Sequence, residues 1–383
     1  MGDPQAERWE SPDVKGLALL LLVTVMAFVN YAGLLSVVPM WAAQGGAASV
    51  AVGGTTGLMM GATVAAQLAS PWLFRVLTLR GMMVLGAVLL GLPTPLYILS
   101  DGLLWILLIT VVRGVGFAMM VVSGAALVAE LAGMGKLSAV ASLYGAAAAV
   151  PNLGALAGGV WAAQTVGFDL VFWAAGIACL AAAGVSLLLS PARAEFSFSS
   201  LAGMGRVLPP LVLFLMAAAS FGALTTFLPL AGPGPAEAAA ALLVASAALI
   251  MGRLTAGFLG GRIRAGRLVV VSAVLGGAGL ALLAVALEGP LPVLLIGAAL
   301  VGGAFGAAQN DSFVATVEGF GPGKSGAAST VWNVAYDGGF GLGAVALGGV
   351  IAAAGYGGAF AAMAVIAGVL ALAVPLLARS RGA

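Results

Sequence analysis

Long apolar runs, separated by short breaks of charged residues, prolines and glycines, are the feature that most constrains how this chain folds. Of its 383 residues, 62% are apolar and 7% are charged, whereas a soluble domain has about 25% charged residues. So few charges cannot cover a soluble domain with hydrated surface. A helix of roughly 20 apolar residues crosses the hydrocarbon core of a bilayer. The sequence therefore predicts an all-α polytopic membrane protein.

The breaks divide the chain into twelve candidate spans, six on each side of a polar stretch. In order, the spans are 16–40, 51–74, 81–99, 103–128, 138–163, 170–189, 207–230, 236–260, 268–287, 291–315, 325–354 and 358–378. We therefore expect a leader over 1–15, a six-helix bundle over 16–189, a linker over 190–206, a second six-helix bundle over 207–378 and a tail over 379–383.

The basic residues predict the orientation of these spans. With the N-terminus inside, the cytoplasmic segments hold all the Lys and Arg residues except Arg113: Arg8, Lys15, Arg75, Arg80, Lys136, Arg193, Arg206, Arg253, Arg262, Arg264, Arg267, Lys324, Arg379 and Arg381. The external loops hold only acids, namely Asp101, Asp169, Glu237 and Glu288. Short loops rich in Lys and Arg stay in the cytoplasm, so both termini are predicted to be inside. The first run is too long, and its leader too acidic, for a cleaved signal peptide.

Several kinds of chemistry are excluded by composition. The chain has no His and one Cys, Cys179, which removes imidazole metal sites, His-based catalysis, disulfides and zinc sites. The segment Gly321 to Ser325 lacks the spacing of a phosphate loop, so direct ATP drive is not expected. The basic residues are too scattered to bind nucleic acid. We expect no enzyme activity, no cofactor and no bound metal.

An internal repeat relates the two halves at an offset of 187 residues. The basic loop from Arg75 to Arg80 corresponds to the loop from Arg262 to Arg267, and Ser142 corresponds to Ser329. Parallel six-span halves related by an axis along the membrane normal suit alternating access to a site near the midplane.

Three motifs carry a resemblance to a known family. These are Gly257-Phe-Leu-Gly-Gly-Arg262-Ile-Arg-Ala-Gly-Arg267, Arg113-Gly-Val-Gly-Phe-Ala118, and Pro151-Asn-Leu-Gly154 followed by Gly158-Gly159. Over essentially its whole length the chain resembles the major facilitator superfamily. The third motif is similar to a Gly-Pro motif of exporters, although that pair is broken here, and Gly261 and Phe74 stand where the loop motif has an acid.

The resemblance implies a working monomer whose first, fourth, seventh and tenth spans line the central cavity. It further implies that the two basic loops gate the cytoplasmic side, through Arg75, Arg80, Arg262 and Arg267. Asn30, Tyr31, Arg113 and Phe221 become cavity candidates on the same ground.

Two charges lie deep inside predicted spans, where a charge costs about 2.5 to 3.5 kcal/mol even on insertion scales. Arg113 lies too far from a span end to reach water, and it is either a structural residue or, as the resemblance implies, part of proton coupling. Asp337 shares a helix face with Asn333. A carboxylate desolvated there holds a proton more readily than one in water, so Asp337 is our first candidate for the proton carrier; the alternative is a helix-packing carboxylate.

The remaining site candidates are polar or aromatic residues at depth. They are Asn30, Tyr31, Asn152, Phe221, Gln309, Asn310, Trp332, Asn333 and Tyr336. Asp311, near the cytoplasmic end of its span, is more typical of a cap or gate residue.

The chain is therefore interpreted as a secondary active transporter that exchanges protons for a small organic or amphiphilic compound and exports it. The alternative is a proton-coupled uptake symporter for a sugar or an organic anion, with Arg113 contacting the anion. A sensor or scaffold would normally carry a soluble domain, and none is expected here. The partners are then a small-molecule substrate, protons and lipid, and the location is a bacterial cytoplasmic membrane.

Overall fold

The computed structural model describes residues 13–132, 137–193, 204–232, 234–260, 262–287, 289–321 and 325–380. Over these ranges the chain is helical and contains no β-strand. Most of the leader and linker, together with Lys136, Gly261, Glu288, Lys324 and Arg381, lie outside the described residues.

The first half of the chain forms six membrane-length segments, several of which are interrupted. The first is α2 (Val14–Leu34) with α3 (Val37–Gln44), and the second is α4 (Ser49–Leu68), followed by a short α5 (Ser70–Val76). The third joins α6 (Leu79–Gly91) to a 3₁₀ turn, η1 (Thr94–Leu99), and the fourth is α7 (Leu103–Leu131). The fifth contains α8 (Leu137–Pro151), a π-helical turn η2 (Asn152–Leu156) and α9 (Ala157–Thr165), and the sixth is α10 (Phe168–Ser186).

The second half repeats this arrangement with fewer interruptions. Its segments are α11 (Met204–Phe227) with a 3₁₀ turn η3 (Leu228–Leu230), α12 (Pro235–Leu259), α13 (Leu268–Ala286), α14 (Leu291–Phe320) and α15 (Ser325–Ser380). The stretch from Ala327 to Leu377 in α15 is 51 residues long, more than twice a bilayer crossing. Gly355 divides it, because its φ of 68° and ψ of 178° break the helix. The eleven long apolar helices of the described chain thus make twelve spans.

Three span ends differ from the prediction by four residues or more, the tenth span continuing to Phe320 rather than to residue 315. The first span continues to Gln44, because the chain breaks only briefly after Leu34 and α3 resumes the helix at Val37. The second span ends at Leu68 rather than at residue 74. Pro71 removes a backbone donor within the first turn of α5, and α5 is a separate short helix that contains Arg75.

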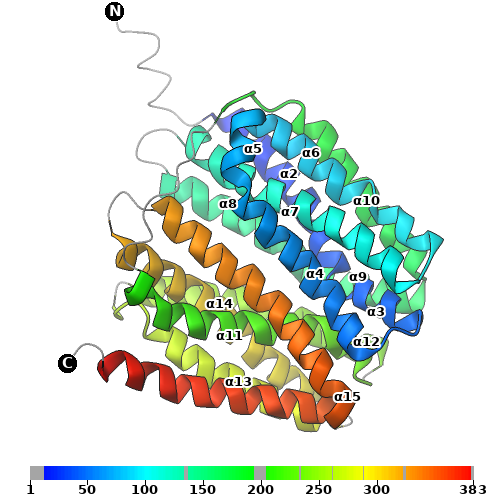
Figure 1. The fold of residues 1–383 in the computed structure, drawn as a ribbon, viewed down its shortest axis with the longest axis vertical. Coiled ribbons are helices and arrows are strands. Elements are labelled where there is room, and N and C mark those ends of the chain that lie inside the picture. The colour runs from blue at the N-terminus through cyan, green and yellow to red at the C-terminus, as the bar shows by residue number, and fades with distance from the viewer. Residues whose placement is uncertain are drawn as a thin grey trace, which may run out of the picture.

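Both ends of the described chain lie at the same end of the helix bundle (Figure 1). We call this the basic end, because the two Arg-containing loops, Arg75 to Arg80 and Arg262 to Arg267, are also found there; the opposite end is the far end. By the positive-inside rule the basic end is expected to be cytoplasmic.

The two halves pack together mainly toward the far end. Among the described residues, α11 contacts α3 of the first span, and α12 contacts η2 and α9 of the fifth span. Every residue of α11 from Met216 to Phe227 is buried, whereas Leu208 nearer the basic end is 46% exposed. The contacts of α11 and α12 with the first half therefore lie toward the far end, whereas α4 and α15 stay in contact as far as Gln67, close to the basic end.

Candidate functional site

Arg113 of α7 lies inside the first half and is 1% exposed. Its guanidinium donates to the Asn30 amide oxygen over 3.0 Å and to the Tyr97 hydroxyl over 3.3 Å, and it stands 5.6 Å from the Tyr97 ring centroid. Both partners are neutral, and Nε has no hydrogen-bond partner among the described residues.

A second layer of hydrogen bonds fixes these two partners. Asn30 donates to the Thr94 hydroxyl over 3.2 Å and to the Ala175 carbonyl over 2.9 Å, while the Tyr97 and Thr110 hydroxyls lie 2.8 Å apart. These residues come from the first, third, fourth and sixth spans, all in the first half. The Arg113 network therefore moves as one body with that half.

Asp337 of α15 has a different kind of partner. Its carboxylate, on a residue that is 4% exposed, accepts a hydrogen bond of 2.8 Å from the side-chain amide of Gln67 in α4. This bond joins the two halves of the protein. Asp337 therefore lies where a movement of one half against the other changes its surroundings.

Glycines on both helices bring α4 and α15 this close. A Cβ on Gly341 would stand 2.9 Å from Cβ of Met60 and 3.2 Å from Cα of Gly57, and Gly348 and Gly53 make similar approaches nearer the far end. Small residues at such spacing let helix backbones approach closely. Gln67 and Asp337 lie on the basic side of these glycine contacts, and α4 and α15 run side by side in Figure 1.

Two buried polar atoms near Asp337 have no hydrogen-bond partner among the described residues. They are the hydroxyl of Tyr31 and the side-chain oxygen of Gln67. Tyr31 stacks on Phe117 with centroids 4.0 Å apart, and it lies near enough to Asp337 and Tyr336 to interact electrostatically. A buried polar atom without a hydrogen-bond partner costs free energy. These two atoms therefore mark a place where a proton, a water molecule or a polar substrate group fits.

The predicted aromatic candidates gather in the second half. Trp332 stacks on Phe214 with centroids 5.0 Å apart and donates to the Ser312 hydroxyl over 2.9 Å. Tyr336 packs against Trp332 at 5.7 Å. Phe221 is buried and stacks on Phe305 at 4.8 Å, in the core of that half.

The amide candidates are spread over three helices. Gln309 is buried, with its side chain beside the Tyr336 hydroxyl. Asn310 donates to the Arg253 carbonyl over 3.3 Å. Asn152 opens the π-helical turn of the fifth span, and Asn333 is half-buried one turn before Asp337.

The structure places two further residues beside predicted site residues. Gln67, expected only as a polar residue of its span, is the partner of Asp337. Arg253, counted among the cytoplasmic bases, lies inside α12, because the helix continues to Leu259 and packs on α14 through Gly302 and Gly306. Its position within the apolar run 236–260 is the feature of the sequence that indicates a place inside the span.

The basic loops are tied to neighbouring helices. Arg80 donates to the Leu189 carbonyl over 3.4 Å, and the Arg262 guanidinium lies 4.6 Å from the Phe258 ring centroid; Arg75 and Arg267 are exposed. Asp311 accepts from the backbone amides of Gly266 and Val269, at 3.1 and 2.8 Å. It thus caps the start of α13, which confirms the prediction of a cap.

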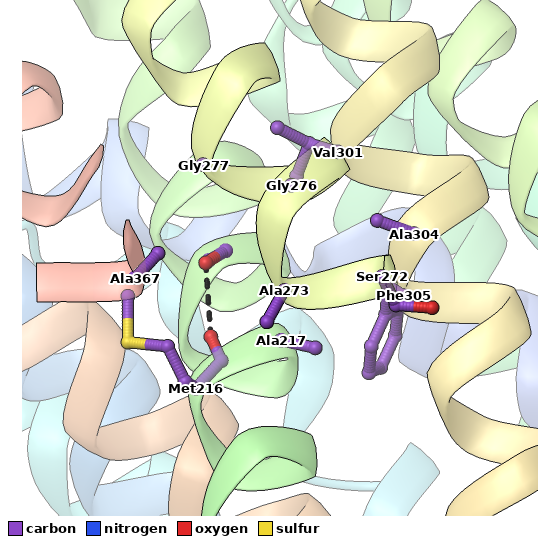
Figure 2. A pocket seen from close by; sticks show the side chains of 11 residues that line it. Met216, Ala217, Ser272, Ala273, Gly276, Gly277, Val301, Ala304, Phe305 and Ala367 are labelled. Atoms are coloured by element: carbon purple, nitrogen blue, oxygen red, sulfur yellow. Dashed lines mark hydrogen bonds between the residues drawn. The ribbon is translucent and has the colours of Figure 1, made fainter. Parts of the chain in front are cut away.

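A small, mostly apolar pocket lies elsewhere in the second half (Figure 2). None of the predicted site residues lines it, and its serine hydroxyl at Ser220 already donates to the Met216 carbonyl over 2.9 Å. Its walls come from α11, α13, α14 and the last part of α15: Met216, Ala217, Ser220, Ser272, Ala273, Gly276, Gly277, Val301, Ala304, Phe305 and Ala367. The described residues contain no group of three or more acidic or Cys side chains able to hold a metal.

Solved structures with the same arrangement of helices are transporters. A transporter of the POT family in complex with a thioalcohol-conjugated peptide superimposes with a TM-score of 0.79 at 13% identity, over 96% of each chain. A variant of the nucleoside transporter NupG gives 0.76 at 14% identity, over 94% of this chain and 99% of that one. A bacterial homologue of the human lysosomal transporter Spinster, inward-facing and occupied, gives 0.73 at 16%, over 99% and 98%.

At these identities the likeness establishes the fold alone. No protein of curated function matches the sequence. The sequence profile of the Major Facilitator Superfamily matches residues 20–344, which is most of the chain. The chain therefore belongs to the major facilitator superfamily and is a multi-pass membrane transporter rather than an enzyme.

Proposed function

We propose that this protein is a proton-coupled secondary transporter that works by alternating access and exports a small organic or amphiphilic compound in exchange for protons. The observation that carries the proposal is the buried hydrogen bond between Gln67 and Asp337. It is made between the two halves, so the protonation of one carboxylate and the relative position of the halves depend on each other.

Asp337 is an acid whose hydrogen-bond partner, Gln67, is neutral. Gln67 offers an amide donor and no positive charge, so an ionised Asp337 leaves a net negative charge inside the membrane, where charges are expensive. Binding a proton removes that charge. If the charged form of a group is less stable in one conformation than in the other, binding a proton to that group shifts the equilibrium between the two conformations. Asp337 is thus suited to couple proton binding to rocking of the halves.

Arg113 has a supporting part in this proposal. Its partners belong to the first half, so its guanidinium is a fixed positive charge that holds the first, third, fourth and sixth spans together. Tyr31 of the same half completes the coupling site across from Asp337 and Tyr336.

The fifth span supports export as the proposed direction of transport. Pro151 and the π-helical turn after it interrupt the fifth span at the exporter-like motif. The working unit is proposed to be a monomer in a bacterial cytoplasmic membrane.

The test is proton flux in liposomes that contain the purified protein and a pH dye. Gradients of lipophilic cations, organic anions and sugars are imposed in turn on the wild type, on Asp337→Asn and on Asp169→Asn. The last is the matched control, because Asp169 is an acid in the first turn of α10 at the far end. The proposal is supported if protons move in response to a gradient of only one class of compound, and if that proton flux is lost in Asp337→Asn but kept in Asp169→Asn. Substrate movement without protons, or normal coupling in Asp337→Asn, contradicts it.

Uptake of an organic anion together with protons is the second candidate. The observation that favours an anion is Arg253, which lies inside a span and is exposed. Arg113 fits this role less well, since it is buried and bonded to Asn30 and Tyr97. The flux assay separates the two candidates, because protons move against the compound in export and with it in uptake.

A further inference from the structure

Arg253 lies between the two halves near the basic end. It is six residues before the end of α12 at Leu259, roughly 9 Å into the helix. On the opposite half, a Cβ on Gly145 of α8 would stand 3.3 Å from Nη2 of Arg253. In its own half, Tyr336 lies within electrostatic range. The guanidinium therefore lies between α12 and α8, that is, between the two halves.

The backbone of Arg253 is held firmly while its side chain is exposed. Asn310 donates to its carbonyl, and a Cβ on Gly306 of α14 would stand 3.0 Å from its backbone nitrogen. These contacts fix this turn of α12 against α14. The guanidinium thus projects from a rigid support, as a binding group requires.

The described surroundings of Arg253 supply no acid to neutralise it. Among the described residues no carboxylate pairs with it, and the titratable side chain that acts on it is the Tyr336 phenol. A guanidinium this far into a span has an energetic cost. An accessible cation without a partner, at the opening between the halves, is what an incoming anion meets first.

We propose that Arg253 binds an anionic group, a carboxylate or phosphate, of the transported compound. The planar guanidinium forms paired hydrogen bonds with either group. The Tyr336 hydroxyl and the Gln309 amide beside it offer further hydrogen bonds. This inference deepens the proposed function and rests on the part that export and uptake share, namely that a compound passes between the halves; it does not depend on the direction of transport.

The first experiment measures the electrostatic potential beside Arg253 without knowledge of the compound. Gly145→Cys places a thiol opposite the guanidinium, and the native Cys179 is buried, so it does not react. The purified variant is treated with two methanethiosulfonate reagents of similar size, one a sulfonate and one a trimethylammonium. Adding Arg253→Gln is expected to lower the rate ratio of anionic to cationic reagent about tenfold. Arg193→Gln, the matched control at an exposed arginine after α10, leaves the ratio unchanged.

The second experiment asks whether an organic anion occupies the site. The labelling rate of the thiol introduced by Gly145→Cys is measured with phenylacetate, phenylethanol or phenylethylamine present, three probes that share one ring and differ in head group. Protection by phenylacetate alone, lost with Arg253→Gln, supports the proposal. Equal protection by the alcohol, or no effect of Arg253→Gln on either measurement, overturns it.

A lipid headgroup has the same chemistry as a phosphate substrate, so the labelling is repeated in nanodiscs. Protection by phosphatidylglycerol but not by phosphatidylcholine, with no protection by phenylacetate, would overturn the substrate assignment. None of these measurements involves proton flux. Failure of Arg253 as an anion site is therefore distinguishable from failure of Asp337 as the proton carrier.

Discussion

The two interfaces that join the halves are built differently. The α4–α15 interface is lined with glycines toward the far end and ends in the Gln67–Asp337 hydrogen bond. The α9–α12 interface continues along η2, and beside it Gln164 of α9 donates a weaker bond of 3.5 Å to the Pro229 carbonyl of η3. Nearer the basic end, Arg253 of α12 faces Gly145 of α8. One interface thus places a carboxylate in a closed contact, and the other places a guanidinium in an open one.

In a nearly symmetric fold, the two interfaces are therefore suited to different tasks, one to binding a proton and the other to binding a charged compound. At the repeat offset of 187 residues, Arg253 corresponds to Ala66 and Asp337 to Val150, so each charge belongs to the second half alone. A proton site needs shielding from water, which the close α4–α15 contact provides. A site for a charged compound needs access, which the exposed side chain of Arg253 provides.

Arg113 belongs to neither interface, so replacing it separates an effect within the first half from effects at the contacts between the halves. Arg113→Met removes the guanidinium and leaves the Asn30 oxygen and the Tyr97 hydroxyl without that donor. We expect the largest loss of stability of the variants considered, about 3 kcal/mol, seen as a lower Tm in the intrinsic tryptophan signal of the purified protein. Arg75→Met, at an exposed arginine, is the control. An unchanged Tm for Arg113→Met would contradict its assignment as the centre of a rigid network.

Gly341→Leu breaks the α4–α15 interface directly. The new side chain meets Met60 and Gly57, and overpacking of this kind costs about 2 kcal/mol. We expect the halves to open toward the far end, which increases labelling of a cysteine introduced at Thr56, a buried residue of α4 whose hydroxyl lies 3.0 Å from that of Thr226 in the other half. Gly61→Leu on α4 is the matched control, because a Cβ at Gly61 meets no atom within 4 Å. Equal labelling of both variants would show that the glycine contacts do not hold the halves together.

Gln67→Leu tests the polar end of the same interface. It removes the amide that donates to Asp337 and leaves an apolar side chain in its place, so we expect a loss of about 1 kcal/mol and a reduced coupling ratio of protons to compound in liposomes. Gln67→Asn, a shorter amide, is expected to restore part of the ratio. A normal ratio in Gln67→Leu would mean that the cross-half bond is incidental.

The smallest effect is expected at the contact between α9 and η3, beside the α9–α12 interface. Gln164→Ala removes one long hydrogen bond, so the change in stability is expected to stay below about 0.5 kcal/mol, and transport should be unchanged. A loss comparable to that of Gln67→Leu, in the same flux and Tm measurements, would erase the difference between the two interfaces.

Hydropathy and loop charge were sufficient to predict twelve spans in two halves, because bilayer thickness fixes the length of each apolar run. Gly355, which breaks α15, was placed correctly between two runs. The sequence also singled out Arg113 and Asp337, since charge inside a run is rare. Their partners were not predictable, because Gln67 and Asp337 are 270 residues apart and meet only through packing of the halves. Arg253 was misplaced because a basic residue near a span end resembles a loop residue.

The central claim is that protonation of Asp337 governs the relative position of the halves. Spin labels at Val50→Cys on α4 and Ala353→Cys on α15, both exposed near the far end, report that position in a Cys179→Ala background. The distance between them is measured by double electron–electron resonance from about pH 5 to pH 9. The account predicts a distance distribution that changes with pH in the otherwise native protein and does not change in Asp337→Asn. The same pH-dependent change in Asp337→Asn would contradict it.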